Sequence, residues 1–404
     1  MSQKSYTFTK REFMKKAFFL IIFLLSLSLH NIFSQTGNDT LVYLLTCGTG
    51  TETYSIYGHS ALRIVFTEKK RDWVFNWGVF DFETPNFAWK FAKGRLDYML
   101  AVESMESFLK VYVYEKRYVQ SQRLNLSQGE TGKLVALINE NLKPENIKYR
   151  YDFFYDDCST RIRDLIEKAV GEKFLYPPDT EGKYPSFREM VGKYQDPFPW
   201  LDFGIDLIMG STADKEASLR NRMFLPIDLQ KELSESVVNR DGKMIPLLQN
   251  PDLILDFDPP KISKIFLTTP SIVFTGLLII VLIMSALIKS RRAIKWFDLS
   301  VFSLFSIMAG MMIFFNFFTD HQQMRWNLNI IWLNPVVIIC LLFIILNKEA
   351  TFWFRLLSYT LATFLIIHLF LPQSFNMAII PLVIILLIRS SVRSGFEWNP
   401  LSLK

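Results

Sequence analysis

A cysteine at the predicted start of a helix is the residue of this sequence best suited to nucleophilic chemistry. Cys158 follows two aspartates, Asp156 and Asp157, either of which is a favourable N-cap, and apolar residues at helical spacing follow it as far as Gly171. A thiol in the first turn of a helix lies beside free backbone N–H groups and the positive end of the helix dipole, which favour the nucleophilic thiolate. The same N–H groups are suited to hold a developing oxyanion, so we predict that Cys158 is a catalytic nucleophile.

A cysteine nucleophile usually needs a base, and histidine is a common one. The sequence has four histidines, of which His30 lies in an N-terminal apolar segment and His321 and His368 lie in a C-terminal apolar region. Only His59 belongs to the central part of the chain that carries Cys158. If this thiol is paired with an imidazole, His59 is therefore the catalytic base.

A third polar group normally orients the imidazole of such a pair. Asn76 and Asp81 lie on or directly after the next predicted strand and are the candidates for this catalytic role, with Asp97 and Asp202 as more distant alternatives.

Further side chains are predicted to bind substrate. The candidates are Tyr57, Ser60, Arg161 and His321. The first two flank the candidate base, and the third lies one turn into the helix that the nucleophile opens. His321 follows the second C-terminal apolar segment, where it is placed to contact lipid headgroups; the alternative interpretation is an ordinary polar residue at a helix end.

Other interpretations of the same residues stay open. A cysteine near a helix start is often inert packing, and in an oxidising compartment Cys47 and Cys158 are able to form a structural disulfide. Cys340 lies in an apolar segment and is interpreted as buried filler. One histidine and two distant cysteines do not match zinc-ligand spacing, and no glycine-rich phosphate loop is present, so neither a metal nor a cofactor is predicted.

The elements that must position these residues can be read from local patterns. Residues 41–47, 61–66, 73–80 and 149–155 are short runs rich in β-branched, aromatic and aliphatic residues, and they predict strands. Ser127 and Glu130 form a capping-box pattern that predicts a helix through Leu142. The soluble domain is therefore predicted to be of the α+β class.

The composition indicates where this domain lies in the cell. The chain is 50% hydrophobic and 21% charged, which excludes intrinsic disorder, and three cysteines in 404 residues exclude a disulfide scaffold. Lysine and arginine at positions 10–16 precede an apolar run at 17–29, and small polar residues follow. This pattern predicts a secretory signal peptide over residues 1–34, cleaved near Ser34.

The C-terminal third is predicted to be a bundle of about five transmembrane helices. Apolar segments cover residues 272–288, 301–318, 330–346, 354–371 and 377–388. The basic residues between and after these spans all fall on one side, which is then cytoplasmic, and the segment before residue 272 lies outside. The domains are thus an exported domain at 35–260, a linker at 261–270 and a membrane domain at 271–404. Cytoplasmic anchoring explains much of the net charge of +6, so no nucleic-acid partner is predicted.

The motifs together resemble one bacterial family, the Lnb-type proteins, which are typical of the Bacteroidetes. The resemblance rests on Leu45-Thr46-Cys47, Tyr57-Gly58-His59-Ser60-Ala61-Leu62-Arg63 and Tyr155-Asp156-Asp157-Cys158-Ser159-Thr160-Arg161. Residues 202–207, Gly210, residues 224–226 and the membrane-side run 327–335 also look like that family. The similarity covers nearly all of the mature chain and is specific in combination.

The resemblance implies a fold and an activity. It implies a circularly permuted papain-like periplasmic domain, related to NlpC-type peptidases, in which histidine precedes cysteine as His59 precedes Cys158 here. The implied protein is a multi-pass inner-membrane N-acyltransferase, which moves an acyl chain from a membrane phospholipid through a Cys158 thioester to the N-terminal cysteine amine of a diacylated lipoprotein. The alternatives are a membrane-tethered periplasmic cysteine hydrolase acting on cell-wall peptide or lipid, and a non-enzymatic envelope protein with a Cys47–Cys158 disulfide.

Overall fold

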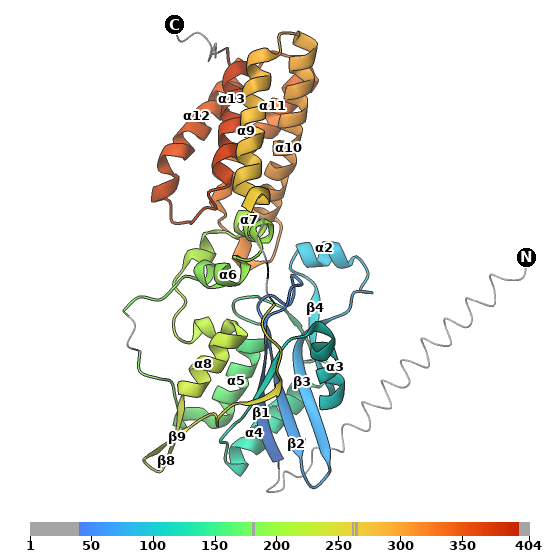
Figure 1. Ribbon diagram of the computed structural model, residues 1–404, viewed down its shortest axis with the longest axis vertical. Helices are drawn as coiled ribbons and strands as arrows, with labels where there is room; N and C mark the ends of the chain where they lie inside the picture. Colours follow the sequence, from blue (N-terminus) through green and yellow to red (C-terminus); the bar gives the residue numbers. More distant parts are fainter. Residues whose placement is uncertain (1–39, 180–181, 261, 263–265, 396–404) are drawn as a thin grey trace, which may run out of the picture.

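A sheet-rich N-terminal domain and a helical C-terminal region make up the computed structural model, which describes residues 40–179, 182–260, 262 and 266–395. The predicted signal peptide and its cleavage site lie outside the described residues. The helical bundle stands at one end of the molecule and the sheet at the other, with two short helices between them (Figure 1).

Seven antiparallel strands form the main sheet in the order β10-β5-β1-β2-β3-β4-β6. They are β1 (Thr40–Cys47), β2 (His59–Phe66), β3 (Arg71–Phe80), β4 (Asp97–Ser104), β5 (Val119–Arg123), β6 (Lys148–Arg150) and β10 (Asp252–Leu255). The strands β7 (Phe174–Leu175), β8 (Val237–Arg240) and β9 (Lys243–Pro246) form a small second sheet. The first three predicted strands are confirmed to within two residues.

The fourth predicted strand, over residues 149–155, is wrong beyond its first residues. Only Lys148–Arg150 forms a strand. The carboxylate of Asp152 accepts hydrogen bonds from the backbone N–H groups of Phe154 and Tyr155 at 3.0 and 3.1 Å, and this bends the chain into a turn. Phe153 and Phe154 pack instead in a cluster with Phe187 and Phe224, while Tyr149 and Tyr151 pack in the main core.

Helices cover both faces of the main sheet. One face carries α4 (Gln128–Asn141), α5 (Cys158–Val170) and α8 (Pro226–Glu235), whose apolar residues share a core with Leu44, Leu62 and Phe75. The other face carries α3 (Met105–Glu115), which packs against the alternate strand residues Leu45 and Ala61. The capping box that opens α4 at Ser127 and Glu130 is present as predicted.

The C-terminal region contains five helices where five apolar segments were expected. They are α9 (Pro270–Leu287), α10 (Arg291–Phe317), α11 (Val336–Ile345), α12 (Thr351–Ile367) and α13 (Ile379–Arg393). Among the described residues, three helical segments have the length and hydropathy to cross a membrane: Pro270–Leu287, Arg291–Phe317 and Thr351–Phe370. The third predicted span is shorter than expected, because the 3-10 turn Leu328–Ile331 and Pro335 delay the start of α11.

An ion-pair cluster lies buried in the helical bundle. Asp298 is fully buried and accepts hydrogen bonds from Arg389 at 2.7 Å and from Arg393 at 2.5 Å. Arg389 and Arg393 were interpreted as charges that anchor the chain at the cytoplasmic surface. Arg389 is itself only 2% exposed and also donates to Ser285, so it joins helices within the bundle.

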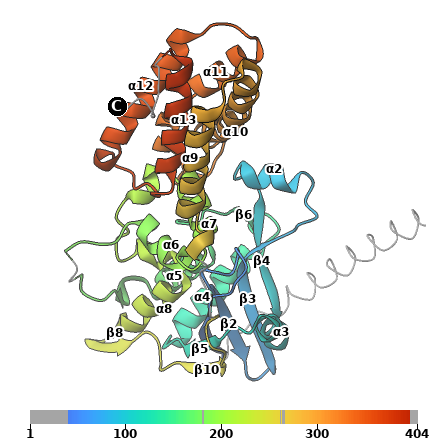
Figure 2. The ribbon, with the colours of Figure 1, turned by 45° about the horizontal axis from the view of Figure 1, so that its top comes forward.

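The two regions are joined through backbone contacts. The short helices α6 (Phe187–Gln195) and α7 (Pro199–Ile208) lie between them (Figure 2). The backbone N–H of Gly210 donates to the Gln323 carbonyl oxygen at 2.8 Å, and the side chains of Asn327 and Asn329 donate to the Leu207 carbonyl oxygen at 2.9 and 3.0 Å. Gly210 is required there, because a Cβ atom would lie 1.9 Å from the carbonyl oxygen of Arg325.

Candidate active site

Cys158 is the first residue of α5, as the sequence predicted. Of the two candidate N-caps, Asp157 is the one observed: its carboxylate accepts the Thr160 backbone N–H at 2.8 Å. Asp156 instead binds the guanidinium of Arg161 in a bidentate pair at 2.6 and 2.8 Å. Burial raises the pKa of the Asp157 carboxyl well above its usual value. Asp156 is thus paired with a guanidinium, and Asp157 is engaged by the backbone at the start of the helix.

The sulfur of Cys158 lies among backbone N–H groups but is buried. The N–H groups of Ser60, Cys158 and Ser159 lie within hydrogen-bonding reach of it, and the Ser159 hydroxyl is 3.8 Å away. These groups lower the pKa of the thiol, whereas burial raises it and has the larger effect. The N–H groups at the helix end thus favour the thiolate as expected, but burial outweighs them and the net pKa of the thiol is raised.

His59 is the first residue of β2, and Asn76 holds its ring. The imidazole Nε2 lies 2.7 Å from the side-chain oxygen of Asn76. Because a carbonyl oxygen only accepts, Nε2 donates this hydrogen bond and Nδ1 keeps a free lone pair. Burial lowers the pKa of His59 to about 4, so the ring is neutral at neutral pH and is able to take up a proton.

Two glycines allow the nucleophile and the ring to share one end of the sheet. Gly58 has a positive φ of 78°, and a Cβ atom there would lie 2.8 Å from the Cys47 carbonyl oxygen. Gly78 has a positive φ of 91°, and its missing Cβ would lie 4.0 Å from the Cβ of Cys158. The positive φ favours glycine at both positions, and at Gly58 a Cβ atom would also collide with the backbone.

Cys158 and the His59 ring approach the same end of the main sheet from opposite faces. Strand alternation places His59 and Asn76 on the face that α3 covers, whereas α5 lies on the other face. Cys158 reaches the strand edge at Ser60, beyond the last paired residues of β2 and β3, Leu62 and Phe75.

Asp81, the other residue predicted to orient the imidazole, lies away from the His59 ring. Asp81 is exposed, and its carboxylate accepts the backbone N–H of Glu83 at 2.8 Å within a turn. The structure thus brings Asn76, and not Asp81, into contact with His59.

The predicted substrate-binding residues fall in different places. The Tyr57 hydroxyl accepts a hydrogen bond from Gln195 at 2.6 Å, and its ring packs on Phe153. The Ser60 side chain is fully buried and accepts from Ser159 at 3.3 Å. His321 Nε2 lies 2.8 Å from the Phe91 carbonyl oxygen.

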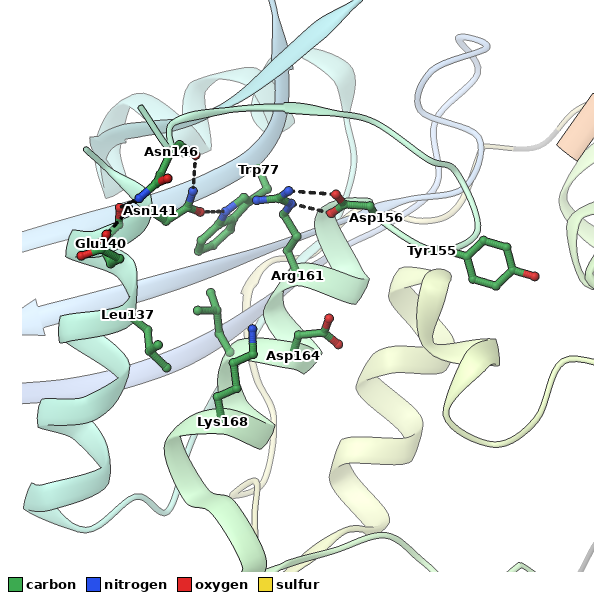
Figure 3. A pocket seen from close by; sticks show the side chains of 11 residues that line it. Trp77, Leu137, Glu140, Asn141, Asn146, Tyr155, Asp156, Arg161, Asp164 and Lys168 are labelled. Atoms are coloured by element: carbon green, nitrogen blue, oxygen red, sulfur yellow. Dashed lines mark hydrogen bonds and ion pairs between the residues drawn. The ribbon is translucent and has the colours of Figure 1, made fainter. Parts of the chain in front are cut away.

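Arg161 borders a pocket of about 570 Å³ between α4 and α5 (Figure 3). Its guanidinium centre lies 3.5 Å from the centroid of the Tyr149 ring, and Figure 3 shows its bidentate pair with Asp156. Trp77 also lines the pocket, and its indole N–H donates to Asn141 at 2.7 Å. The pair with Asp156 occupies two of the guanidinium nitrogens of Arg161, Nε and Nη2.

Arg117 is a charged neighbour of the site that sequence reasoning missed. Its side chain is 5% exposed and donates from Nε to the Gly48 carbonyl oxygen at 2.7 Å, while Nη1 binds Glu115. Within the described part of the chain, its Nη2 has no hydrogen-bond partner. The charge of Arg117 adds to the lowering of the His59 pKa. Nothing in the sequence separates this arginine from the ordinary surface charges around it.

The cysteines do not form the disulfide that one alternative required. Cys47, Cys158 and Cys340 are all free and buried. Burial raises the pKa of Cys47 to about 12. Among the described residues, no group of three or more histidine, cysteine, aspartate or glutamate side chains is arranged to hold a metal ion.

Two family models match this chain. The Lnb N-terminal periplasmic domain matches residues 30–182, which include both His59 and Cys158, and the Lnb transmembrane domain matches residues 261–397. The chain belongs to the Lnb family. The resemblance inferred from the motifs is thereby confirmed, and the chain is an inner-membrane protein with a periplasmic N-terminal domain. The comparisons with curated proteins and with solved structures gave no match.

Proposed function

We propose that this Lnb-family protein is a thiol-dependent acyltransferase that acylates the N-terminal cysteine amine of lipoproteins. The observation that carries the proposal is the arrangement of Cys158, His59 and Asn76: a cysteine at a helix N-terminus, and a neutral imidazole whose tautomer is fixed by an amide. Membership of the Lnb family supports the choice of substrates.

The first half-reaction moves an acyl group from a glycerophospholipid to the protein. His59 Nδ1 takes the thiol proton while the Cys158 sulfur attacks the ester carbonyl carbon. A sulfur–carbon bond forms, the carbon–oxygen bond to glycerol breaks, and the lysophospholipid leaves with the proton that His59 returns. The N–H groups of Ser60, Cys158 and Ser159, which surround the sulfur, are in place to stabilise the oxyanion.

The second half-reaction moves the acyl group to the acceptor. The lipoprotein amine attacks the thioester carbon, a carbon–nitrogen bond forms, and the sulfur–carbon bond breaks. His59 takes the proton from the amine and returns it to the sulfur of Cys158. No oxidant or cofactor enters this balance.

The raised pKa of the thiol and the lowered pKa of the imidazole define how the pair works. The thiol of Cys158 and the imidazole of His59 are both neutral before substrate binds. The proton therefore moves from sulfur to nitrogen when the ester binds, and no thiolate–imidazolium ion pair exists beforehand. Neutral groups suit a buried site that receives an apolar substrate, because a resting ion pair would be costly to desolvate.

The membrane supports this choice of substrates. Both the phospholipid and the diacylated lipoprotein are held in the bilayer, so diffusion in two dimensions brings them to an enzyme anchored there. As part of the proposal, all five C-terminal helices span the membrane, and the periplasmic domain has a circularly permuted papain-like fold, with Tyr57, Ser60, Arg161 and His321 around the path of the substrates.

The decisive experiment is mass spectrometry of lipoprotein N-termini in cells that lack this protein. Complementation with wild type or with the buried-thiol control Cys47→Ala should restore the N-acyl group, whereas Cys158→Ala should not. A fatty-acyl adduct on Cys158 that hydroxylamine removes should accompany restoration. Unchanged N-acylation in the cells that lack the protein would refute the proposal, and a peptide adduct on Cys158 would identify a cell-wall hydrolase instead.

A further inference from the structure

An apolar cavity lies between the periplasmic domain and the membrane domain. Its volume is about 240 Å³, and nearly all of its surface is hydrocarbon or aromatic. The residues that line it come from distant segments and include Tyr57, Leu96, Tyr151, Val191, Ile205 and Met324. A mainly apolar cavity with few polar groups is a common form of ligand site.

The cavity adjoins the nucleophile. Tyr151, one of its walls, has a ring carbon 3.7 Å from the position that a Cβ of Gly78 would take, and the Cβ of Cys158 lies 4.0 Å from the same point. Tyr57, another wall, stands two residues before His59. A group bound to the sulfur of Cys158 is therefore close to the cavity wall that Tyr151 forms.

The other side of the cavity lies at the membrane boundary. The short helix α2 (Phe87–Ala92) has no buried residue, and its C-terminal end is attached to the segment that directly follows α10. The Thr319 hydroxyl donates to the Ala92 carbonyl oxygen at 2.9 Å, and the Asp320 N–H donates to the Lys93 carbonyl oxygen at 2.9 Å. The helix is thus held at the periplasmic end of a candidate membrane span.

Exposed aromatic side chains on and before α2 agree with a place at the lipid surface. Phe82, Trp89 and Phe91 are 72%, 56% and 52% exposed, and the Trp89 ring lies 5.6 Å from that of Phe314 in α10. Aromatic residues are favoured where hydrocarbon meets the headgroup layer. Phe91 also lines the cavity, so one residue lies both at the lipid surface and at the cavity wall.

We propose that this cavity binds the hydrocarbon chain of the acyl group carried by Cys158, which enters from the outer leaflet past Phe91. The inference rests on the proposed acyl transfer and adds the site that selects chain length. Each methylene buried in such a cavity changes affinity by about fourfold, so the length of the cavity sets which donor chains load efficiently.

The test fills the cavity and follows chain-length preference. Ile205→Trp, in α7, places a larger side chain at the wall, while Leu201→Trp is a matched control in the same helix outside the cavity. The full-length protein is placed in vesicles whose phosphatidylethanolamine donors carry chains of about 16 or about 8 carbons, which differ by several methylene increments of affinity. Intact mass spectrometry then measures the acyl thioester on Cys158.

Wild type and Leu201→Trp should load the long chain in preference to the short one. In Ile205→Trp the amount of long-chain thioester on Cys158 should be at least about tenfold lower than in wild type, because several methylenes no longer fit. The amount of short-chain thioester should stay the same. An identical chain-length profile in Ile205→Trp and wild type would overturn this inference and leave the proposed function intact. If wild type forms no thioester with either donor, the proposed function itself fails.

A second variant covers the case in which Ile205→Trp loads neither donor. Ile205→Ala enlarges the cavity and should raise the ratio of long-chain to short-chain loading relative to wild type. An unchanged ratio in Ile205→Ala would then overturn the inference.

Discussion

At the scale of single residues, the site works through a neutral thiol and a neutral imidazole. Burial shifts the pKa values of these two groups in opposite directions. The pKa of Cys158 is raised and that of His59 is lowered to about 4. The sequence pattern predicted the helix start at Cys158 and therefore the backbone N–H groups near its sulfur. The burial that outweighs them depends on residues that arrive from other strands and helices.

The pH dependence of activity should reflect this environment. Below about pH 4 His59 is protonated and no longer accepts the thiol proton, so kcat/KM should fall only near that pH instead of near the ordinary histidine value of about 6.5. Thioester formation measured across acidic pH checks the position of this acid limb.

The isosteric variant Asn76→Asp provides a matched comparison. A carboxylate at the position that now accepts the His59 hydrogen bond stabilises the imidazolium, so the acid limb should move to higher pH by about one to three units. An acid limb at the same pH in both proteins would show that His59 is not the group that titrates.

At the scale of elements, the N-cap of α5 places the nucleophile. Asp157 accepts the Thr160 N–H, and the Thr160 hydroxyl accepts the Asp157 N–H at 2.7 Å, which closes a capping box around Cys158. Asp157→Ala should cost about 1 kcal/mol of unfolding free energy, or a melting temperature lower by about 2–4 °C, and should slow thioester formation.

Asp157→Asn separates the cap from the charge. Asparagine caps helices as well as aspartate does, and its side-chain oxygen is able to accept the same Thr160 N–H without a charge. The melting temperature and the loading rate should therefore stay near those of wild type. Equal losses in the alanine and asparagine variants would contradict a capping role and point to the charge.

The elements themselves were largely predictable where one short stretch carries the whole signal. The α5 helix begins where Asp157 and Cys158 predicted, and the capping box at Ser127 opens α4. The predicted strand at 149–155 failed because the Asp152 side chain competes for the backbone N–H groups there, and a local aromatic pattern does not reveal that competition.

At the scale of the whole molecule, close backbone contact fixes the periplasmic domain to the membrane helices. Gly210→Ala would place a Cβ atom 1.9 Å from the Arg325 carbonyl oxygen and 3.0 Å from the Asn327 nitrogen, and neither atom yields without moving the backbone. We expect a loss of about 1–3 kcal/mol of stability and reduced loading from vesicles. Melting temperature and thioester formation are the measurements.

Gly204→Ala is the matched control. Gly204 lies within α7, and a Cβ atom there would meet nothing within 4 Å. The substitution should stabilise the protein by roughly 0.5–1 kcal/mol, because alanine is favoured over glycine inside a helix. If Gly210→Ala is as stable as Gly204→Ala, the contact between the domains does not depend on this approach.

The junction is the part that the sequence predicted least. The apolar cavity draws its walls from residues as far apart as Tyr57 and Met324, and no local pattern brings them together. His321 was predicted either to contact lipid headgroups or to be an ordinary polar residue at a helix end, and the sequence did not predict that its ring contacts the Phe91 carbonyl oxygen. The contacts of residues such as Tyr57, Met324 and His321 depend on how the periplasmic domain packs on the membrane domain.

The attachment of α2 has a consequence for how this family can vary. Its three hydrogen bonds from residues 319–321 all end on backbone carbonyl oxygens, those of Phe91, Ala92 and Lys93, and none uses an α2 side chain. Substitutions of α2 residues other than Trp89, which packs on Phe314, and Phe91, which packs on His321, should therefore leave the helix attached. A variant with an altered outer surface of α2 should therefore keep these three hydrogen bonds to residues 319–321.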